Sequence, residues 1–348
     1  MNRVALASVI VGDAQRKSFP RILVEAFGWM LRERELPQHY FAQFLYRNGA
    51  DPRRFIGRKR CWRIRRQYFY RGIEHSIPYL ENKHLFWAYL RSTDLPIIEV
   101  VAHSMQNAIL DAGTGTRYEF GRWEDVSAAL EQISASRNQR ELFAKPVFGL
   151  QGGGCIVFRD GVPIIRSPEA AFDLLRRFPY VFQPRLKQES GLEAVNPSSI
   201  NTIRLNVLRE GEEPGRILAP FAKFGTGDAV VDNGGSGGLI LPLDPESGAA
   251  AGPAFRLLKQ GGGTYEEHPD TGYPFSDFRV PDFDRACAVA IRASAQFPNR
   301  FVGWDLAITE AGPVIVEGNS GPNLDCIQML VGGFRGHPEF SPIFSAFL

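Results

Sequence analysis

The sequence predicts a mixed α/β protein of the α+β kind, in which a helical N-terminal region precedes lobes that contain β-sheet. Residues 20–93 repeat apolar side chains at helical spacing, whereas from residue 141 short apolar runs alternate with glycine-rich turns. The chain has 348 residues, which is too long for one small core and suggests two or three lobes. A hydrophobic content of 44% is sufficient for substantial cores.

Individual elements follow from the same patterns. The apolar N-terminal run is short and lacks a good small-residue cleavage site, so we expect a first strand or helix rather than a secretory signal. The segment 244–274 is dense in Pro and Gly and predicts an extended loop or an insertion near the active face. The remaining predicted elements are helices at 123–133, 168–177 and 283–295, and strands at 95–101, 180–183, 203–208 and 217–223.

The composition excludes several classes of protein. No apolar run approaches the length of a membrane span. The four cysteines are scattered without CxxC or zinc spacing, which is typical of reduced thiols in an intracellular protein, and we expect a cytoplasmic location.

The net charge of +2 conceals a basic segment. Residues 52–71 hold nine Lys and Arg residues and no acid, so the rest of the chain is net negative. Aromatic side chains interleave with these bases. The segment could contact an anionic membrane surface or a polyanion, or its arginines could cover their own helix and meet acids elsewhere. Without a reader motif, nucleic acid is an unlikely partner.

The most informative feature is a pair of apolar, β-prone runs around residues 310–312, which predicts a hairpin with a three-residue loop. With the loop centred on its middle residue, Thr309 pairs with Pro313 and Asp305 pairs with Glu317. Opposed residues have Cβ atoms roughly 4.5–5.5 Å apart, where two like charges are destabilising. A bound divalent cation would remove this repulsion. An exposed hairpin with two solvated acids is the alternative.

Asn319 extends the candidate metal site. It lies two residues after Glu317, and alternate residues of a strand share one face. Two carboxylates and an amide oxygen are hard ligands that suit Mg²⁺, an ion that also holds phosphates. We therefore predict that Asp305, Glu317 and Asn319 bind a metal ion.

A glycine-rich turn follows Lys145 between two predicted strands, and it contains Gly149 and residues 152–154. Glycines let the backbone approach a ligand and direct N–H groups at an anion, while a lysine adds a point charge. The turn joins two strands, so it is neither a Walker A loop nor a dinucleotide fingerprint, both of which open a helix. A flexible hairpin with a solvated lysine is the alternative.

Two other stretches are less specific. The apolar strand 180–183 breaks at Pro184 into polar residues, a junction that could offer backbone groups to an adenine. Arg204 stands among apolar neighbours, and a buried arginine requires an anionic partner. That partner is either a phosphate or an acid such as Glu210.

The order of these features resembles the ATP-grasp superfamily: a lysine with a glycine-rich hairpin, a Gln-x-x-Leu junction, then Asp…Glu-x-Asn. The most similar branch is that of sugar-transfer-associated and glutamate-ligase-related proteins. The resemblance covers roughly residues 76–348. It implies an ATP-grasp fold in which two α+β subdomains clasp a nucleotide. The implied division is a helical, basic region at 1–75, in place of the usual α/β domain, and ATP-grasp segments at 76–140, 141–188 and 189–348.

The resemblance also implies residue roles. Lys83 and Lys145 would bind the nucleotide, and Lys145 and Arg204 would act in catalysis, with Arg204 facing the γ-phosphate or an acyl-phosphate. The cofactors would be ATP and one or two Mg²⁺ ions, with Mn²⁺ as an alternative. The other implied nucleotide contacts are Gly149, Gly152, Gly153, Gly154, Gln183, Leu186, and Glu189 or Ser190 near the ribose; Asp305, Glu317 and Asn319 match the metal positions.

These features predict an ATP- and Mg²⁺-dependent ligase that activates a carboxylate as an acyl-phosphate and joins it to an amine. The expected partners are small-molecule, peptide or sugar-linked substrates. One alternative is a kinase that phosphorylates a sugar or polyol hydroxyl. Another is a non-enzymatic module that binds an anionic polymer or membrane through residues 52–71. The sequence leaves the oligomeric state open.

Overall fold

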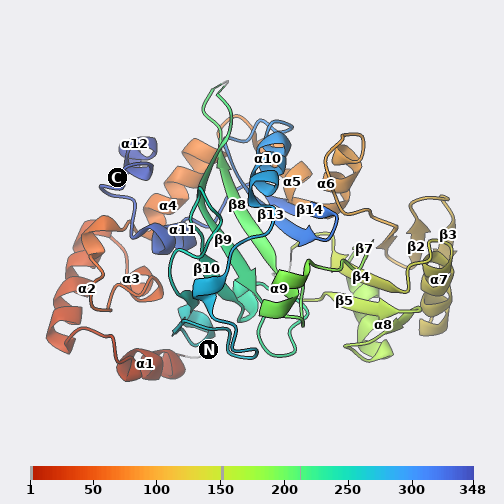
Figure 1. Ribbon diagram of the computed structural model, residues 1–348, viewed down its shortest axis with the longest axis horizontal. Coiled ribbons are helices and arrows are strands. Elements are labelled where there is room, and N and C mark those ends of the chain that lie inside the picture. The colour runs from red at the N-terminus through yellow and green to blue at the C-terminus, as the bar shows by residue number, and fades with distance from the viewer. Residues whose placement is uncertain (1–2, 150–152, 212) are drawn as a thin grey trace.

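Two seven-stranded sheets form the body of the protein, and every described strand pairing within them is antiparallel. The structure is a computed structural model and describes residues 3–149, 153–211 and 213–348. One sheet lies at the centre of Figure 1 and the other at the right, with the N-terminal helices at the left. The predicted α+β class is confirmed.

The small lobe contains the first sheet, in the order β3-β2-β1-β7-β4-β5-β6. Helices α7 (Trp123–Ala135) and α8 (Pro168–Arg177) pack on it, both close to their predicted bounds. Its strands are β1 (Ala102–Met105), β2 (Ala108–Asp111), β3 (Arg117–Glu119), β4 (Glu141–Pro146), β5 (Ile156–Arg159), β6 (Val162–Pro163) and β7 (Tyr180–Pro184).

The large lobe contains the second sheet, in the order β12-β11-β10-β9-β8-β13-β14. Helix α10 (Phe283–Ser294) packs against β8, β13 and β14 through its buried face. The short helix α9 (Ser190–Val195) precedes this sheet. Its strands are β8 (Thr202–Leu208), β9 (Arg216–Phe224), β10 (Leu239–Pro242), β11 (Ala254–Arg256), β12 (Thr264–Tyr265), β13 (Phe301–Thr309) and β14 (Gly312–Asn319).

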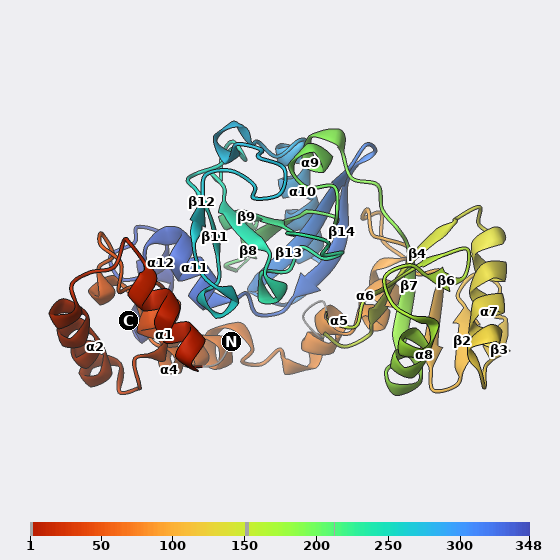
Figure 2. The ribbon, with the colours of Figure 1, turned by 90° about the horizontal axis from the view of Figure 1, so that it is seen from below.

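The N-terminal region is helical, as predicted, and packs together with the C-terminal helices α11 (Leu324–Val331) and α12 (Phe340–Ile343). Figure 2 shows the first helices of this region, up to residue 64, at the opposite end of the molecule from the small lobe. The N-terminal helices are α1 (Arg3–Gly12), α2 (Phe19–Glu33), α3 (Gln38–Ala42), α4 (Arg58–Ile64), α5 (Ile77–Glu81) and α6 (Lys83–Leu90). No helix in the described part of the chain is long and apolar enough to cross a membrane.

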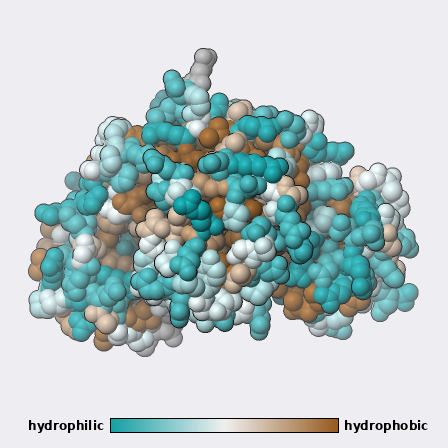
Figure 3. All heavy atoms as spheres, viewed as in Figure 1, coloured by the Kyte–Doolittle hydropathy of each residue, from teal (hydrophilic) through white to brown (hydrophobic). Residues whose placement is uncertain are grey.

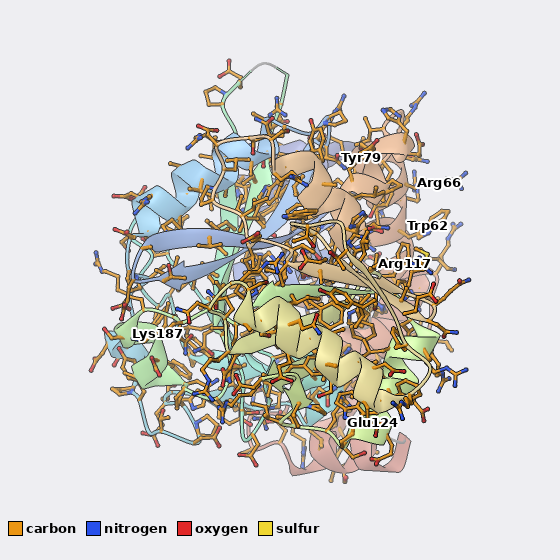
Figure 4. All side chains as sticks on the ribbon, turned by 90° about the vertical axis from the view of Figure 1, so that its right-hand side faces the viewer. Trp62, Arg66, Tyr79, Arg117, Glu124 and Lys187 are labelled. Carbon is orange, nitrogen blue, oxygen red and sulfur yellow. The ribbon has the colours of Figure 1, made fainter. Side chains whose placement is uncertain are left out.

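Part of the basic segment 52–71 is structural. Arg60 binds Glu33 and the carbonyl oxygens of the last two residues, and Arg65 donates to the carbonyl of Gly321. Trp62 of α4 and Arg66, in the turn Arg65–Phe69 that follows α4, instead project from the surface, with the guanidinium 5.3 Å from the centre of the Trp62 ring (Figure 4). The segment therefore combines internal and exposed bases.

Two expectations about local structure were wrong. Residues 95–101 form no regular strand, because Pro96 lacks an N–H and the chain here crosses from the large lobe to the small one; only Ile97 forms a bridge, with Ile315. The segment 244–274 is not simply a loop, because it contributes β11 and β12 to the large sheet. None of its residues lines either cavity described below.

Candidate active site

The acidic hairpin is formed by β13 and β14, and Asp305 pairs with Glu317 as predicted. The loop differs from the prediction. Thr309 pairs with Gly312 rather than with Pro313, so the loop has two residues instead of three. If this register continued unchanged along the hairpin, Val316 would lie opposite Asp305, and Glu317 would be one position away from it.

A β-bulge restores the alignment of the two acids. Leu306 pairs with Ile315 while Asp305 pairs with Glu317, so Val316 is the extra residue on β14. A bulge of this kind re-aims the side chains that follow it. The predicted pairing of the carboxylates is therefore confirmed, but through a shorter loop plus a bulge.

Asp305 is neutralised by two cationic side chains. Its side chain is 2% exposed, and Arg204 binds both carboxylate oxygens, at 2.6 and 2.8 Å. Lys223 Nζ lies 3.0 Å from the same carboxylate. Burial alone would raise the pKa of Asp305, but Arg204 and Lys223 outweigh it and hold that pKa well below its usual range. The anion predicted to accompany Arg204 is thus Asp305 itself rather than Glu210.

Glu317 and Asn319 are more open to the solvent. The Glu317 side chain is 33% exposed and lies 3.8 Å from Lys83 Nζ. The amide nitrogen of Asn319 donates to the carbonyl of Gly303, which leaves the amide oxygen as the atom suited to a cation. Among the described residues, no three His, Cys, Asp or Glu side chains form a metal-sized group. Asp305, Glu317 and Asn319 nevertheless fit a hard cation that completes its shell with phosphate oxygens and water.

These residues line a cavity of about 530 Å³ between the two lobes. Both carboxylates and cations line it. The lining includes the cations Lys83, Lys145, Arg204 and Lys223 and the carboxylates Glu81, Asp232, Asp305 and Glu317.

Burial lowers the pKa of Lys145; the neighbouring charge of Glu317 opposes this shift, and that of Lys83 adds to it. An anionic ligand would stabilise the protonated form of this amine.

The glycine-rich turn joins β4 and β5, and two of its described glycines, Gly149 and Gly153, line the cavity. Gly154 has φ +94°, a left-handed conformation that favours glycine, and its carbonyl accepts a hydrogen bond from the Tyr180 hydroxyl at 2.7 Å. The predicted contact at Gly152 lies outside the described residues. The turn thus lies beside Lys145, as the sequence predicts.

A narrower cavity of about 100 Å³ continues from the first and shares Lys145, Thr202 and Asp232 with it. Its walls are largely apolar, and they include the predicted Gln183 and Leu186. The side-chain oxygen Oε1 of Gln183 is buried and has no hydrogen-bond partner among the described residues. A flat heterocycle with an exocyclic amine is a suitable occupant for such a slot.

The family model for sugar-transfer associated ATP-grasp proteins matches residues 65–334. The chain belongs to this ATP-grasp family. None of the curated proteins matches it. The family assignment agrees with the expected fold, since both lobes combine a sheet with helices.

Solved structures similar to this ATP-grasp chain include the D-cycloserine synthetase DcsG, at 14% identity and a TM-score of 0.42, with 77% of this chain and 70% of that one covered. A D-alanyl-alanine synthetase A from Vibrio cholerae O1 biovar eltor matches at 12% identity and 0.42, with 77% and 63% covered. The ATP-grasp ligase PsnB, complexed with minimal precursor, Mg and ADP, matches at 14% and 0.37, with 77% and 57% covered. The chain thus spans little more than half of PsnB.

Three residues of the ATP-grasp site were not predicted from the sequence. Lys223 and Thr202 are direct partners across β8 and β9, and Asp232 accepts hydrogen bonds from the Thr202 amide and hydroxyl. Burial raises the pKa of Asp232, whereas the pKa of Lys223 is raised because Asp232 and Asp305 outweigh the effect of its burial. A single lysine in the apolar run 217–224 is the signal that could have identified Lys223.

Glu189 and Ser190, expected near a ribose, line neither cavity. The Glu189 carboxylate caps α9 by accepting from the Gly191 amide at 2.8 Å, and it also accepts from the Ser190 hydroxyl. Their assignment to a ribose stays a prediction. Except for Gly154, the other described candidates each line at least one of the two cavities.

Proposed function

We propose that this protein is an ATP- and Mg²⁺-dependent ligase that joins a substrate carboxylate to an amine through an acyl-phosphate. One observation carries the proposal: four cationic side chains and the Asp305–Glu317 pair line a single cavity, which opens into an apolar slot beside Gln183. This arrangement suits a purine at one end and a triphosphate with its metal at the other.

The chain's own residues have distinct roles in this proposal. Lys83, Lys145 and the amides of the glycine turn stabilise charge on the phosphates. Arg204 and Lys223, which line the same cavity, would stabilise charge on the γ-phosphoryl group during its transfer to the carboxylate. The amine then attacks the acyl carbon, phosphate leaves, and an amide bond forms. Because burial lowers the pKa of Lys145, its charge responds strongly to an anion beside it.

Asp305, Glu317 and Asn319 would hold one or two Mg²⁺ ions, with Mn²⁺ as a substitute. The ion would neutralise phosphate charge and template the in-line displacement. The half-buried Glu317 and the oxygen of Asn319 are the first available ligands, because Asp305 is already bound by two cations.

The proposed substrates are an amino acid, a peptide or a sugar-linked carboxylate, together with an amine. We place the reaction in the cytoplasm, where thiols stay reduced, in keeping with four cysteines that are all unpaired.

Trapping with hydroxylamine tests the chemistry. The protein is incubated with Mg-ATP and pools of amino acids, uronic acids or short peptides, and ADP release is measured together with product mass. A hydroxamate that forms only with an active pool supports the ligase. A stable phosphorylated hydroxyl product would contradict it and support the kinase alternative. Glu317→Gln should abolish the Mg²⁺-dependent ADP release. Glu310→Gln, which changes an exposed acid in the loop of the same hairpin, serves as the matched control and should leave ADP release intact.

A further inference from the structure

Helix α2 carries an apolar face that no described part of the chain covers. Its four central side chains are 58–73% exposed, and they are Leu23, Val24, Phe27 and Leu31. We call these four residues the α2 face. Single exposed apolar residues are ordinary, but four on one helix form a contiguous stripe. Such a stripe in water is typical of an interaction surface.

The α2 face points away from the protein. The buried side chains of the helix are Ile22, Ala26 and Trp29, which pack in the N-terminal core with α3. At 100° per residue, Phe27 and Leu31 lie on the opposite side of the helix from these three. In Figure 3, apolar residues appear at the left-hand edge, where Figure 1 places α2. The helix is therefore apolar on both sides, although it has only one core to cover.

The acids of this helix are held inside or at its end. Glu25 accepts from Lys17, Arg21 and Tyr40. The side chain of Glu33 is fully buried; it binds Arg32, Arg60 and Arg335 and accepts from the Gly57 amide. Glu35 accepts from two backbone amides at the start of α4. All three carboxylates are therefore engaged by partners within the chain.

Basic side chains lie beside the α2 face. Arg34 is exposed at the end of α2, and Lys59 of α4 donates to its carbonyl, which brings the basic helix α4 beside the end of α2. Leu36, 68% exposed, and Trp62, 57% exposed, continue the apolar character next to these bases. Leu and Phe on one face with Arg, Lys and Trp at the edge form the pattern of a helix that lies in a membrane interface.

We propose that the α2 face docks on an anionic lipid surface, with its side chains in the acyl boundary and the neighbouring bases at the phosphates. This inference is independent of the proposed ligase activity. Charge favours lipid over a second copy of the chain, because anionic headgroups complement the exposed bases beside the α2 face, whereas a second α2 offers only carboxylates that are already engaged within their own chain.

Cosedimentation with vesicles tests the proposal. The full chain is mixed with vesicles of 70% phosphatidylcholine and 30% phosphatidylglycerol, or of phosphatidylcholine alone. We expect binding to the anionic vesicles, weaker binding to the neutral ones, and release in 0.5 M salt. Phe27→Asp with Leu31→Asp should reduce the partition at least about tenfold, because both apolar contacts are lost and negative charge is added. Arg34→Gln with Lys59→Gln should reduce binding only to the anionic vesicles.

Met105→Asp is the matched control, since Met105 is 67% exposed on the small lobe, far from α2. Circular dichroism and the thermal shift with Mg-ATP verify that each variant is folded. The proposal is overturned if the wild-type chain ignores anionic vesicles, or if Met105→Asp weakens binding as much as the α2 variants do. A dimer in sedimentation analysis that Phe27→Asp dissociates, without vesicle binding, would assign the α2 face to a second copy instead.

Discussion

Arg204 and Asp305 are direct partners across β8 and β13, and the guanidinium binds both oxygens of the carboxylate. Lys223 adds a second cation to the same buried acid. The charge of Asp305 therefore has a structural role, in addition to the metal role that the sequence predicts for it. This separates Asp305 from its neighbour Glu317, although the sequence alone treats the two acids alike.

The first prediction concerns this difference in stability. Asp305→Asn should lower the free energy of unfolding by on the order of 3 kcal/mol, because it leaves the poorly solvated Arg204 without its carboxylate and removes one of the two acids beside Lys223. Glu317→Gln should cost less than about 1 kcal/mol, since its pair with Lys83 is longer and partly exposed. Urea denaturation without nucleotide measures both. Equal losses in the two variants would contradict the structural role of Asp305. Both variants should lose Mg²⁺-dependent ATP turnover.

The second prediction concerns Lys145. Because burial lowers its pKa in the free protein and a phosphate would favour its charged form, ATP binding at alkaline pH should be accompanied by proton uptake. Titration calorimetry in buffers of different ionisation enthalpy measures the protons taken up. Lys145→Arg should bind without this uptake, since arginine stays charged. An unchanged uptake in the arginine variant would exclude Lys145 as the proton acceptor.

The third prediction concerns nucleotide selectivity. The unpartnered Oε1 of buried Gln183 can accept a hydrogen bond from the 6-amino group of adenine, whereas the 6-keto oxygen of inosine would face it unfavourably. The wild-type protein should therefore prefer ATP to ITP by roughly tenfold or more. Gln183→Leu should lose most of this preference in a fluorescent-nucleotide displacement assay. A uniform weakening of both nucleotides would indicate lost packing rather than a lost hydrogen bond.

The fourth prediction concerns acid stability in the small lobe. Arg137, with the amides of Thr114 and Gly113, lowers the pKa of the Asp111 carboxyl to about 2. A depressed pKa stabilises the fold at pH values above about 4, and this contribution disappears as pH falls from about 4 to about 2. Asp111→Asn should therefore cost about 2 kcal/mol at pH 7 and much less near pH 2.

Denaturation at several pH values measures this effect. Asp160→Asn provides the comparison, because the Asp160–Arg140 pair is exposed and should contribute little at any pH. If Asp111→Asn lowers the free energy of unfolding by the same amount at every pH, the charge of the Asp111 carboxylate does not contribute to stability.

The sequence predicts the parts of the site that depend on local pattern. Period-2 alternation places Glu317 and Asn319 on one face, and the glycines after Lys145 require a turn there. Contacts between distant strands are not encoded locally. The bulge at Val316 depends on the pairing of β14 with β13, so the predicted loop length was wrong although the acid pair was right.

Other misses have the same physical origin. Lys223 and Asp232 enter the site only because β9 pairs with β8 and Asp232 returns to the Thr202 amide. The small strands β1 to β3 have three or four residues each, too few to show a period. The exposed α2 face gives the same apolar repeat as a buried one, so only the structure distinguishes them.

The crossings between the lobes have a mechanical consequence. In the first connection, Pro96 and Ile98 form backbone hydrogen bonds with Ile315 of β14. In the second, the Glu189 amide donates to the Ile308 carbonyl of β13. Both connections are therefore hydrogen-bonded to the acidic hairpin. A rotation of the small lobe about these two connections would therefore leave the pairing of β13 with β14, and with it the alignment of Asp305 and Glu317, unchanged.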